Sequence, residues 1–185
     1  MLYGFEKIAP AQGKRVGTAV CPFGFDVSVW EFFSILCFGG SLHLLTVDTY
    51  ANPFSFAKYI SNHQVTSSYI PPALLSDMAE AFEKQNVSLS LDRFLVGVEP
   101  IPQGVLQRFR DLSDGVHIIN GYGPTESTIC ATFFNFSQQT KPEHRAPIGK
   151  PVAGYQIFLF NQQQQPVPIG VAGELYVGGI GVARG

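Results

Sequence analysis

The sequence predicts an α/β fold, with a largely parallel sheet flanked by helices and a C-terminal antiparallel, barrel-like β region. Short apolar runs alternate with helical segments of about ten residues as far as Thr132, which is typical of a parallel α/β layer structure. Beyond that point the apolar runs shorten, and glycine, proline and a polar turn separate them, which indicates hairpins. With 185 residues and 45% apolar content, the chain can bury the core of one domain.

No clear element is expected before residue 15, and the first expected element is a short strand over residues 15–20. A helix then begins at Ser28, where Glu31 three residues on completes a capping-box pattern, and it ends at Gly39-Gly40. This helix is apolar over most of its surface, so we expect it to be well buried.

The later elements follow the same alternation. A strand over 41–47 precedes a helix over 53–62, in which Asn52 is the expected cap and Pro53 the first residue. The remaining expected elements are a strand at 65–70, a helix at 73–84, a strand at 91–98, a helix at 102–111, a strand at 116–120, and short strands at Ile148, Val152, 155–160 and 174–177, with a solvated loop at 161–165.

Composition excludes several classes of function. The formal charge of −2 and the charged fraction of 14% argue against a nucleic-acid partner. No window approaches the roughly eighteen continuous apolar residues of a membrane span, and no signal peptide is evident. The three cysteines (Cys21, Cys37 and Cys130) are odd in number and lack metal-site spacing, so we expect reduced thiols in a cytoplasmic protein. The glycine-rich end suggests a piece of a longer polypeptide.

The most informative motif is NGYGPTE at residues 120–126, directly after the apolar run 116–119. A loop at the carboxyl end of a buried strand lies where α/β sheets bind ligands. Tyr122 could stack on a base, Thr125 could donate to a phosphate, and Glu126 could bind magnesium. The alternative is an ordinary turn, with a Thr-Glu pair that caps the next segment.

Two further motifs carry candidate chemistry. In FDVSVWE (residues 25–31), Asp26 precedes an apolar helix beside aromatic residues. It is either a helix-start aspartate that favours the helix dipole, or a carboxylate placed to pair with a ligand ammonium group. The run GELYVGG at 173–179 leads into Ala-Arg-Gly at 183–185, and by spacing alone it could be a plain strand with glycine turns.

Taken in order, FDVSVWE, NGYGPTE and GELYVGGIGVARG resemble three successive core motifs of the amino-acid adenylation domains of nonribosomal peptide synthetases. That family belongs to the adenylate-forming superfamily, with acyl-CoA synthetases and luciferases. The resemblance runs from about residue 15 to residue 185. It implies that residues 1–185 are part of the large N-terminal subdomain of this fold. It also implies a ligase that activates an amino acid with ATP and Mg²⁺ as aminoacyl-AMP, for transfer to the phosphopantetheine thiol of a carrier domain.

On the nucleotide side, the resemblance implies that Asn120 contacts the adenine amino group and Tyr122 stacks on the ring, with Gly123 in the same binding set. Thr125 would touch the α-phosphate and Glu126 would bind magnesium, which makes these two the catalytic residues. The carrier and condensation domains of the same synthetase are the implied partners.

On the substrate side, the resemblance assigns Asp26 to the α-amino group of the amino acid. The implied side-chain pocket consists of Val27, Trp30, Tyr69, Leu95, Gly97, Gly121, Ile129 and Cys130. None of the pocket residues is charged, and Gly97 and Gly121 leave room, so we expect a neutral substrate, apolar or aromatic. Tyr69 and Cys130 could equally serve a polar group.

The chain also departs from the family pattern. Gly97-Val98-Glu99 stands where the family often has Gly-Gly-Glu, and Val98 could crowd the adenine. The resemblance places the phosphate loop, the ribose-binding aspartate, the hinge and the C-terminal subdomain outside these residues, so the segment alone should not catalyse. The competing interpretations are an acyl- or aryl-CoA synthetase, which Asp26 argues against, and a non-catalytic α/β binding module.

Overall fold

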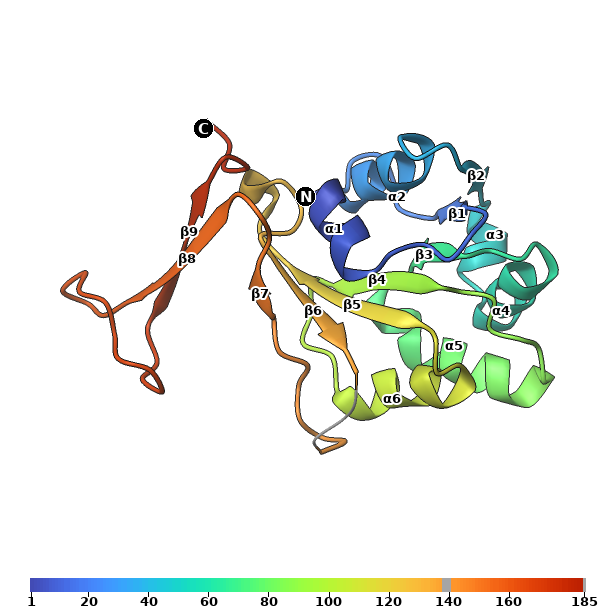
Figure 1. Cartoon of the computed structure of the whole chain (residues 1–185). Coiled ribbons are helices and arrows are strands. Elements are labelled where there is room, and N and C mark those ends of the chain that lie inside the picture. Colours follow the sequence, from blue (N-terminus) through green and yellow to red (C-terminus); the bar gives the residue numbers. More distant parts are fainter. Residues whose placement is uncertain (138–140, 185) are drawn as a thin grey trace.

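The computed structural model describes residues 1–137 and 141–184, and it centres on a seven-stranded sheet of order β2-β1-β3-β4-β5-β6-β7 (Figure 1). The parallel strands are β1 (Val16–Ala19), β2 (Ser41–Leu44), β3 (Ser67–Tyr69), β4 (Arg93–Gly97) and β5 (His117–Tyr122). The antiparallel strands β6 (Thr132–Phe136) and β7 (Lys150–Pro151) extend the sheet beyond β5. A separate antiparallel hairpin joins β8 (Tyr155–Phe160) to β9 (Glu174–Gly179). The predicted parallel layer and the antiparallel C-terminal region are both confirmed.

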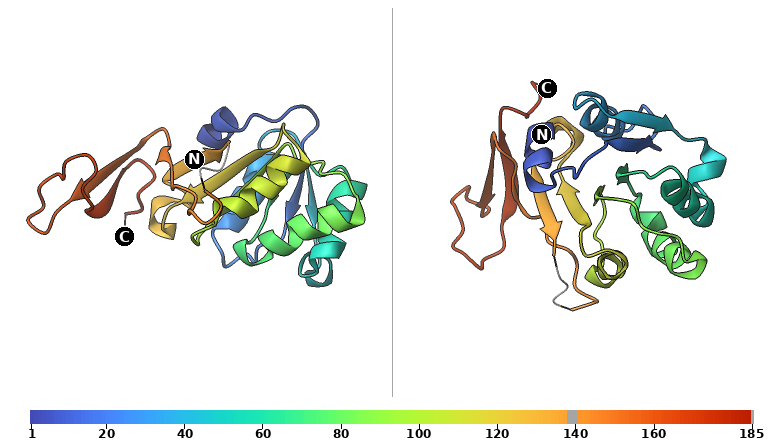
Figure 2. Two further views of the ribbon diagram at one scale, coloured as in Figure 1. Left: turned by 90° about the horizontal axis from the view of Figure 1, so that it is seen from below. Right: turned by 45° about the vertical axis from the view of Figure 1, so that its right-hand side comes forward.

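Helices cover both faces of the large sheet (Figures 1 and 2). One face carries α1 (Leu2–Ile8) and α2 (Val27–Leu36), and the other carries α4 (Pro53–Asn62), α5 (Pro72–Gln85) and α6 (Gln103–Leu112). The short helix α3 (Val47–Tyr50) precedes α4. Aromatic rings join helices to the sheet on each side: Phe109 of α6 packs 5.0 Å from Phe94 of β4, and Phe5 of α1 packs 5.7 Å from Phe133 of β6. No described helix is long and apolar enough to cross a membrane.

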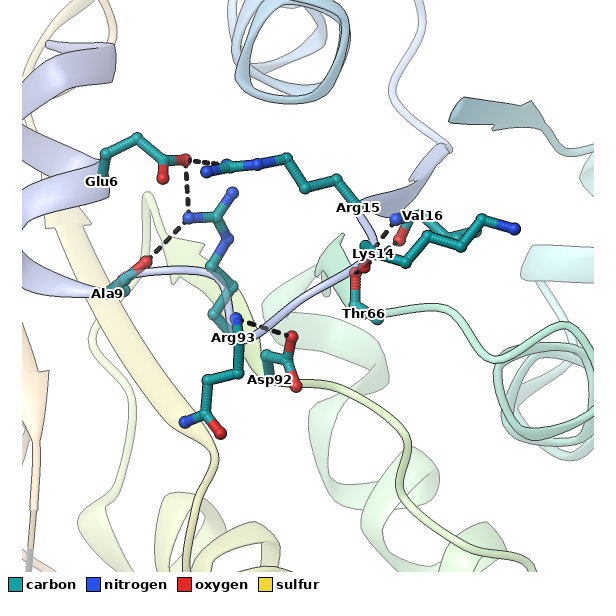
Figure 3. Close-up of polar contacts among 9 residues, drawn as sticks. Glu6, Ala9, Lys14, Arg15, Val16, Thr66, Asp92 and Arg93 are labelled. Atoms are coloured by element: carbon teal, nitrogen blue, oxygen red, sulfur yellow. Dashed lines mark hydrogen bonds and ion pairs between the residues drawn. The ribbon is translucent and has the colours of Figure 1, made fainter. Parts of the chain in front are cut away.

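Helix α1 is an element that the sequence pattern does not predict. A helix of this length is marginal on local propensity, so tertiary contacts must hold it. Arg93, at the start of β4, donates to the carbonyl oxygen of Ala9 at 2.7 Å and pairs with Glu6 at 2.6 Å (Figure 3). Arg15 pairs with the same Glu6 oxygen at 2.7 Å. The end of α1 is therefore anchored to the sheet by a buried guanidinium.

The predicted capping box at the start of α2 is wrong. Asp26, not Ser28, is the N-cap residue, and its side chain makes no capping hydrogen bond. Glu31 does not return to the helix start, because its carboxylate accepts hydrogen bonds from the backbone of Val20 and Cys21. The expected burial of α2 is also only half right: Val27, Trp30 and Ile35 are in the core, whereas Val29, Phe33 and Leu36 are about half exposed.

Other elements confirm or shift the expectations. Asn52 caps α4 by accepting from the backbone N–H of Ser55 at 3.0 Å, with Pro53 as the first residue. The expected strand at 41–47 ends at Leu44, and Val47 already belongs to α3. Strand β6 was not predicted, β7 lies between the expected positions Ile148 and Val152, and β5 continues through Gly121 and Tyr122. The three cysteines are free thiols.

Candidate active site

The candidate site lies where the strand order reverses. From β1 the chain passes to β2 on one side and then to β3 on the other, and ligands of open α/β sheets bind at such a switch point, beyond the carboxyl ends of the strands. The loop after β1 carries Asp26, β3 ends at Tyr69, and β5 ends at Tyr122. A cavity of about 280 Å³ opens there, which we call the first cavity, lined by Asp26, Val27, Tyr69, Leu95, Val96, Gly97, Val98, Gly121, Tyr122, Gly123, Pro124, Ile129 and Cys130.

This cavity brings together every residue expected on the substrate side except one. Trp30 is not among the lining residues: it is 1% exposed and packs edge-on against Phe5. Val96 and Pro124 also line the cavity, although no pattern in the sequence assigned them a role. Val98, which was expected only to crowd the adenine, lines this cavity as well.

Asp26 is the only charged residue that lines the first cavity. Its carboxylate makes no hydrogen bond or ion pair with any described residue, so it remains available to a ligand. Burial raises the pKa of the Tyr69 phenol and raises the pKa of the Cys130 thiol to about 12. Both groups are therefore neutral near pH 7, and the cavity offers one negative charge among neutral walls.

Two glycines shape the cavity wall by close packing. Gly97 and Gly121 lie opposite each other in β4 and β5, and a Cβ at Gly97 would be 2.2 Å from the Gly121 carbonyl oxygen. A Cβ at Gly121 would be 2.6 Å from the Cys130 sulfur. The expectation that these glycines leave open room therefore needs refinement, because protein atoms already occupy the space beside both.

The loop that brings Ile129 and Cys130 into the cavity is strained. Thr128 and Ile129 both have positive φ, of 57° and 70°. Two successive β-branched residues in this region cost on the order of 1–2 kcal/mol each, so the surroundings must hold them. The Thr128 hydroxyl donates to the carbonyl oxygen of Gly181 at 2.6 Å, and the backbone N–H of Cys130 donates to the Thr128 carbonyl oxygen at 2.9 Å.

The segment at the end of GELYVGGIGVARG contacts the loop that carries NGYGPTE. The backbone N–H of Ala183 donates to the carbonyl oxygen of Glu126 at 2.7 Å. The Tyr155 hydroxyl, at the start of β8, donates to the carbonyl oxygen of Ser127 at 2.7 Å. The hairpin and the segment that follows β9 thus hold the loop that joins β5 to β6.

A second cavity of about 350 Å³ adjoins the first, and it is lined by Val98, Glu99, Pro100, Asn120, Gly121, Tyr122, Arg145, Ala146 and Ile148. Asn120 is 5% exposed, and its amide nitrogen donates to the carbonyl oxygen of Pro147 at 2.9 Å. Its Oδ1 therefore remains as an acceptor for a ligand donor such as an exocyclic amine. Val98, Gly121 and Tyr122 line both cavities, so two ligands would meet there.

Thr125 and Glu126 lie in a short 3₁₀ turn (η1, Thr125–Ser127) directly after the shared wall, and both are exposed. The Glu126 carboxylate makes no hydrogen bond or ion pair with the rest of the described chain. No group of three His, Cys, Asp or Glu residues among the described residues could hold a metal by itself. A lone carboxylate nevertheless suits Mg²⁺, which takes one or two carboxylates and completes its shell with substrate phosphates and water. Gly123 lines the first cavity only.

Val98 is held in an unfavourable backbone conformation at this boundary. Its φ is 65°, and its side chain is 59% exposed. Left-handed backbone is easy for glycine and costly for a β-branched residue, so glycine would fit this position with less strain than valine.

Comparison with known proteins agrees with this geometry. The sequence profile of the family described as AMP-binding enzyme matches residues 3–185. The chain belongs to the AMP-binding enzyme family. It is 37% identical over 165 residues to tyrocidine synthase 3 of Brevibacillus parabrevis, covering 89% of this chain and 2% of that protein. It is 32% identical over 164 residues to malpinin synthetase of Mortierella alpina, covering 88% of this chain and 2% of that protein.

Solved structures show the same fold. The chain superposes on the nonribosomal peptide synthetase FmoA3 with a TM-score of 0.89 at 24% identity, covering 100% of this chain and 20% of that one. It superposes on the Klebsiella oxytoca NpsA N-terminal subdomain with a TM-score of 0.78 at 20% identity, covering 97% and 45%. The chain therefore spans a small part of its curated relatives and just under half of one N-terminal subdomain. The resemblance to peptide-synthetase adenylation domains is confirmed.

Proposed function

We propose that this AMP-binding chain selects an amino acid within an adenylation domain of a nonribosomal peptide synthetase. The domain activates the amino acid with ATP as aminoacyl-AMP and releases pyrophosphate. The aminoacyl group then passes to the phosphopantetheine thiol of a carrier domain. The observation that carries the proposal is the position of Asp26, the one charge in a neutral cavity that shares a wall with the Asn120 cavity.

Asp26 supplies recognition of the substrate amine. An ammonium group that enters the first cavity leaves water, and a facing carboxylate compensates it far better there than at the surface. A substrate without an amine would cover the partly buried carboxylate without pairing it, at a cost in binding. The site therefore favours an α-amino acid over a simple carboxylic acid.

The second cavity supplies recognition of the nucleotide. Asn120 Oδ1 accepts from the adenine amino group, and Tyr122 offers its ring for stacking. Thr125 donates to the α-phosphate, and Glu126 holds Mg²⁺, which when bound neutralises phosphate charge. The substrate carboxylate then attacks the α-phosphorus and the bond to pyrophosphate breaks, so the shared wall of the two cavities contributes mainly orientation.

The substrate side chain is neutral, and apolar or aromatic. Leu95, Ile129 and the neutral thiol of Cys130 contribute apolar wall, and no cation faces the cavity to pair with an acidic side chain. A charged side chain would be buried without a counter-ion of its own, because Asp26 already pairs with the α-amino group, and this burial would cost roughly several kcal/mol. The Tyr69 phenol is the main polar group available to the side chain.

The proposal extends to the rest of the protein. The phosphate loop, hinge and C-terminal subdomain lie outside residues 1–185, and the segment alone does not catalyse. Carrier and condensation domains are the partners, in the cytoplasm. The structure of PA1221, a nonribosomal peptide synthetase protein with adenylation and PCP domains, supports a carrier partner, because this chain matches 36% of it with a TM-score of 0.83.

Amino-acid-dependent ATP–pyrophosphate exchange by the complete adenylation domain tests this function. A panel of neutral, acidic and basic amino acids, with aryl and fatty acids as competitors, gives the substrate class. We expect exchange with one or a few neutral apolar or aromatic amino acids. Exchange driven by aryl or fatty acids alone would favour a CoA-synthetase type of ligase, and absence of ATP binding would favour a non-catalytic module.

A further inference from the structure

Glu31 is a buried carboxylate that the proposed chemistry does not use. It lies on α2 and is 1% exposed. None of the cations in the described part of the chain forms an ion pair with it. Burial raises its pKa to about 7, although two backbone hydrogen bonds act in the opposite direction. Burial of a carboxylate without an ion-pair partner costs free energy of folding, which suggests that Glu31 has a specific role at this position.

The two hydrogen bonds of Glu31 close the loop that carries Asp26. Oε1 accepts from the backbone N–H of Val20 at 2.9 Å, and Oε2 accepts from the backbone N–H of Cys21 at 3.0 Å. These bonds join the second turn of α2 to the end of β1, and Asp26 lies between the two attachment points. Inside the closed loop, Phe25 N–H donates to the Pro22 carbonyl oxygen at 2.9 Å, which tightens the approach to Asp26.

We propose that Glu31 is a positioning residue that holds the Asp26 loop in the conformation that binds the substrate amine. The proposal rests on the proposed role of Asp26. An ionised carboxylate can accept from both N–H groups at once, and such charge-assisted bonds are about twice as strong as neutral ones. A protonated carboxyl group keeps one full acceptor, its carbonyl oxygen, whereas its hydroxyl oxygen accepts only weakly, so one of the two bonds is weakened.

Ionisation of Glu31 therefore couples to amino-acid binding. The titratable groups that sense its charge are the Cys21 thiol on the loop after β1 and the Tyr69 phenol at the end of β3, and the pKa of each is raised, first by burial and then in part by Glu31. Asp26 also acts on Cys21. Both the thiol and the phenol stay neutral near pH 7, so the proton that moves in this range belongs to Glu31. Amino-acid affinity should fall as the pH falls below about 7.

The test is a comparison of Glu31→Gln with wild type in the complete adenylation domain, by pyrophosphate exchange between about pH 6 and pH 8. Glutamine has nearly the same shape but only one acceptor oxygen, so we expect the KM for the amino acid to rise roughly tenfold, with the KM for ATP unchanged. In wild type the KM for the amino acid should rise as the pH falls through this range, and in Glu31→Gln it should be flat.

Ser34→Ala is the matched control, because Ser34 is a buried polar residue of the same helix whose hydroxyl has no partner among the described residues. It should leave both KM values unchanged. If Glu31→Gln does not fold, the wild-type pH profile decides, and a pH-independent KM would overturn the proposal. Equal rises in the KM for ATP and for the amino acid, or a pH dependence retained in Glu31→Gln, would also overturn it. Failure of wild type to show any amino-acid-dependent exchange would instead overturn the proposed function.

Discussion

The side-chain amide of Asn120 donates to the carbonyl oxygen of Pro147 at 2.9 Å. This contact fixes which end of the amide faces the second cavity, because the nitrogen is engaged and Oδ1 remains free to accept. The carbonyl of Pro147 thus orients the amide of Asn120 for its proposed contact with the adenine amino group.

Asn120→Asp should weaken ATP binding. The aspartate keeps an acceptor but loses the donor to Pro147, and it places a negative charge against that carbonyl oxygen. We expect the KM for ATP to rise by roughly tenfold or more, with the KM for the amino acid changed little. Asn135→Asp is the control, since Asn135 also donates to a backbone carbonyl, that of Ile8, but lines neither cavity. Equal KM values for ATP in Asn120→Asp and wild type would contradict the assignment.

Val98→Asn should stabilise the domain. Asparagine tolerates the left-handed conformation that Val98 adopts at φ 65°, and it avoids the extra unfolded-state entropy of glycine. We expect the free energy of unfolding to rise by about 1 kcal/mol, measured by chemical denaturation. Val98→Ala keeps a Cβ and should gain less. A lower stability for Val98→Asn than for Val98→Ala would show that the backbone at this position is not strained.

The sequence predicted the parallel layer because its strands are short apolar runs between helices with recognisable starts and ends, as at Asn52-Pro53. It also predicted most of the cavity, because Asp26 and the loop from Asn120 to Cys130 follow directly from strands. Helix α1 could not be predicted, because its stability comes from Arg93, which is remote in sequence. The predicted capping box at Glu31 is wrong for a similar reason. The spacing of residues along the helix does not show that the carboxylate accepts hydrogen bonds from the backbone that follows β1.

Gly121→Ala should disturb the substrate cavity. The added Cβ would lie 2.6 Å from the Cys130 sulfur and 3.1 Å from a Leu95 methyl group, so one of them must move. Overpacking of this kind costs on the order of 1–3 kcal/mol, and we expect a comparable loss in unfolding free energy together with a raised KM for the amino acid. The double variant Gly121→Ala/Cys130→Ala removes the clashing sulfur and should recover part of both losses. No recovery would mean that Cys130 does not limit the space.

Glu6→Gln should destabilise the domain by roughly 3–5 kcal/mol, because Arg93 is 1% exposed and would keep an uncompensated charge. Arg15→Gln, at the more exposed partner of Glu6, should cost about 1 kcal/mol or less. Similar losses in the two variants, measured by denaturant unfolding, would contradict the buried role of Arg93.

The same contacts predict an acid sensitivity. Burial acts to raise the pKa of Glu6, but hydrogen bonds and charges from Arg15 and Arg93 outweigh it, so the pKa is lowered on folding. The stabilisation from Glu6 is therefore present above its unfolded pKa of 4.5 and is lost as the pH falls through the lower, folded value. Unfolding free energies measured from neutral to acid pH should fall less steeply for Glu6→Gln than for wild type, and parallel curves would contradict this.

The central claim is that Asp26 recognises the amine of the substrate. The most direct measurement is pyrophosphate exchange by Asp26→Ala in the complete domain, with the preferred amino acid and with the same acid lacking its α-amino group, beside Asp48→Asn on α3 as a control remote from the cavity. We expect Asp26→Ala to lose amino-acid-dependent exchange and its preference for the amino acid over the desamino analogue, while Asp48→Asn behaves as wild type. Near-normal exchange by Asp26→Ala, with the preference for the amine retained, would contradict the central claim.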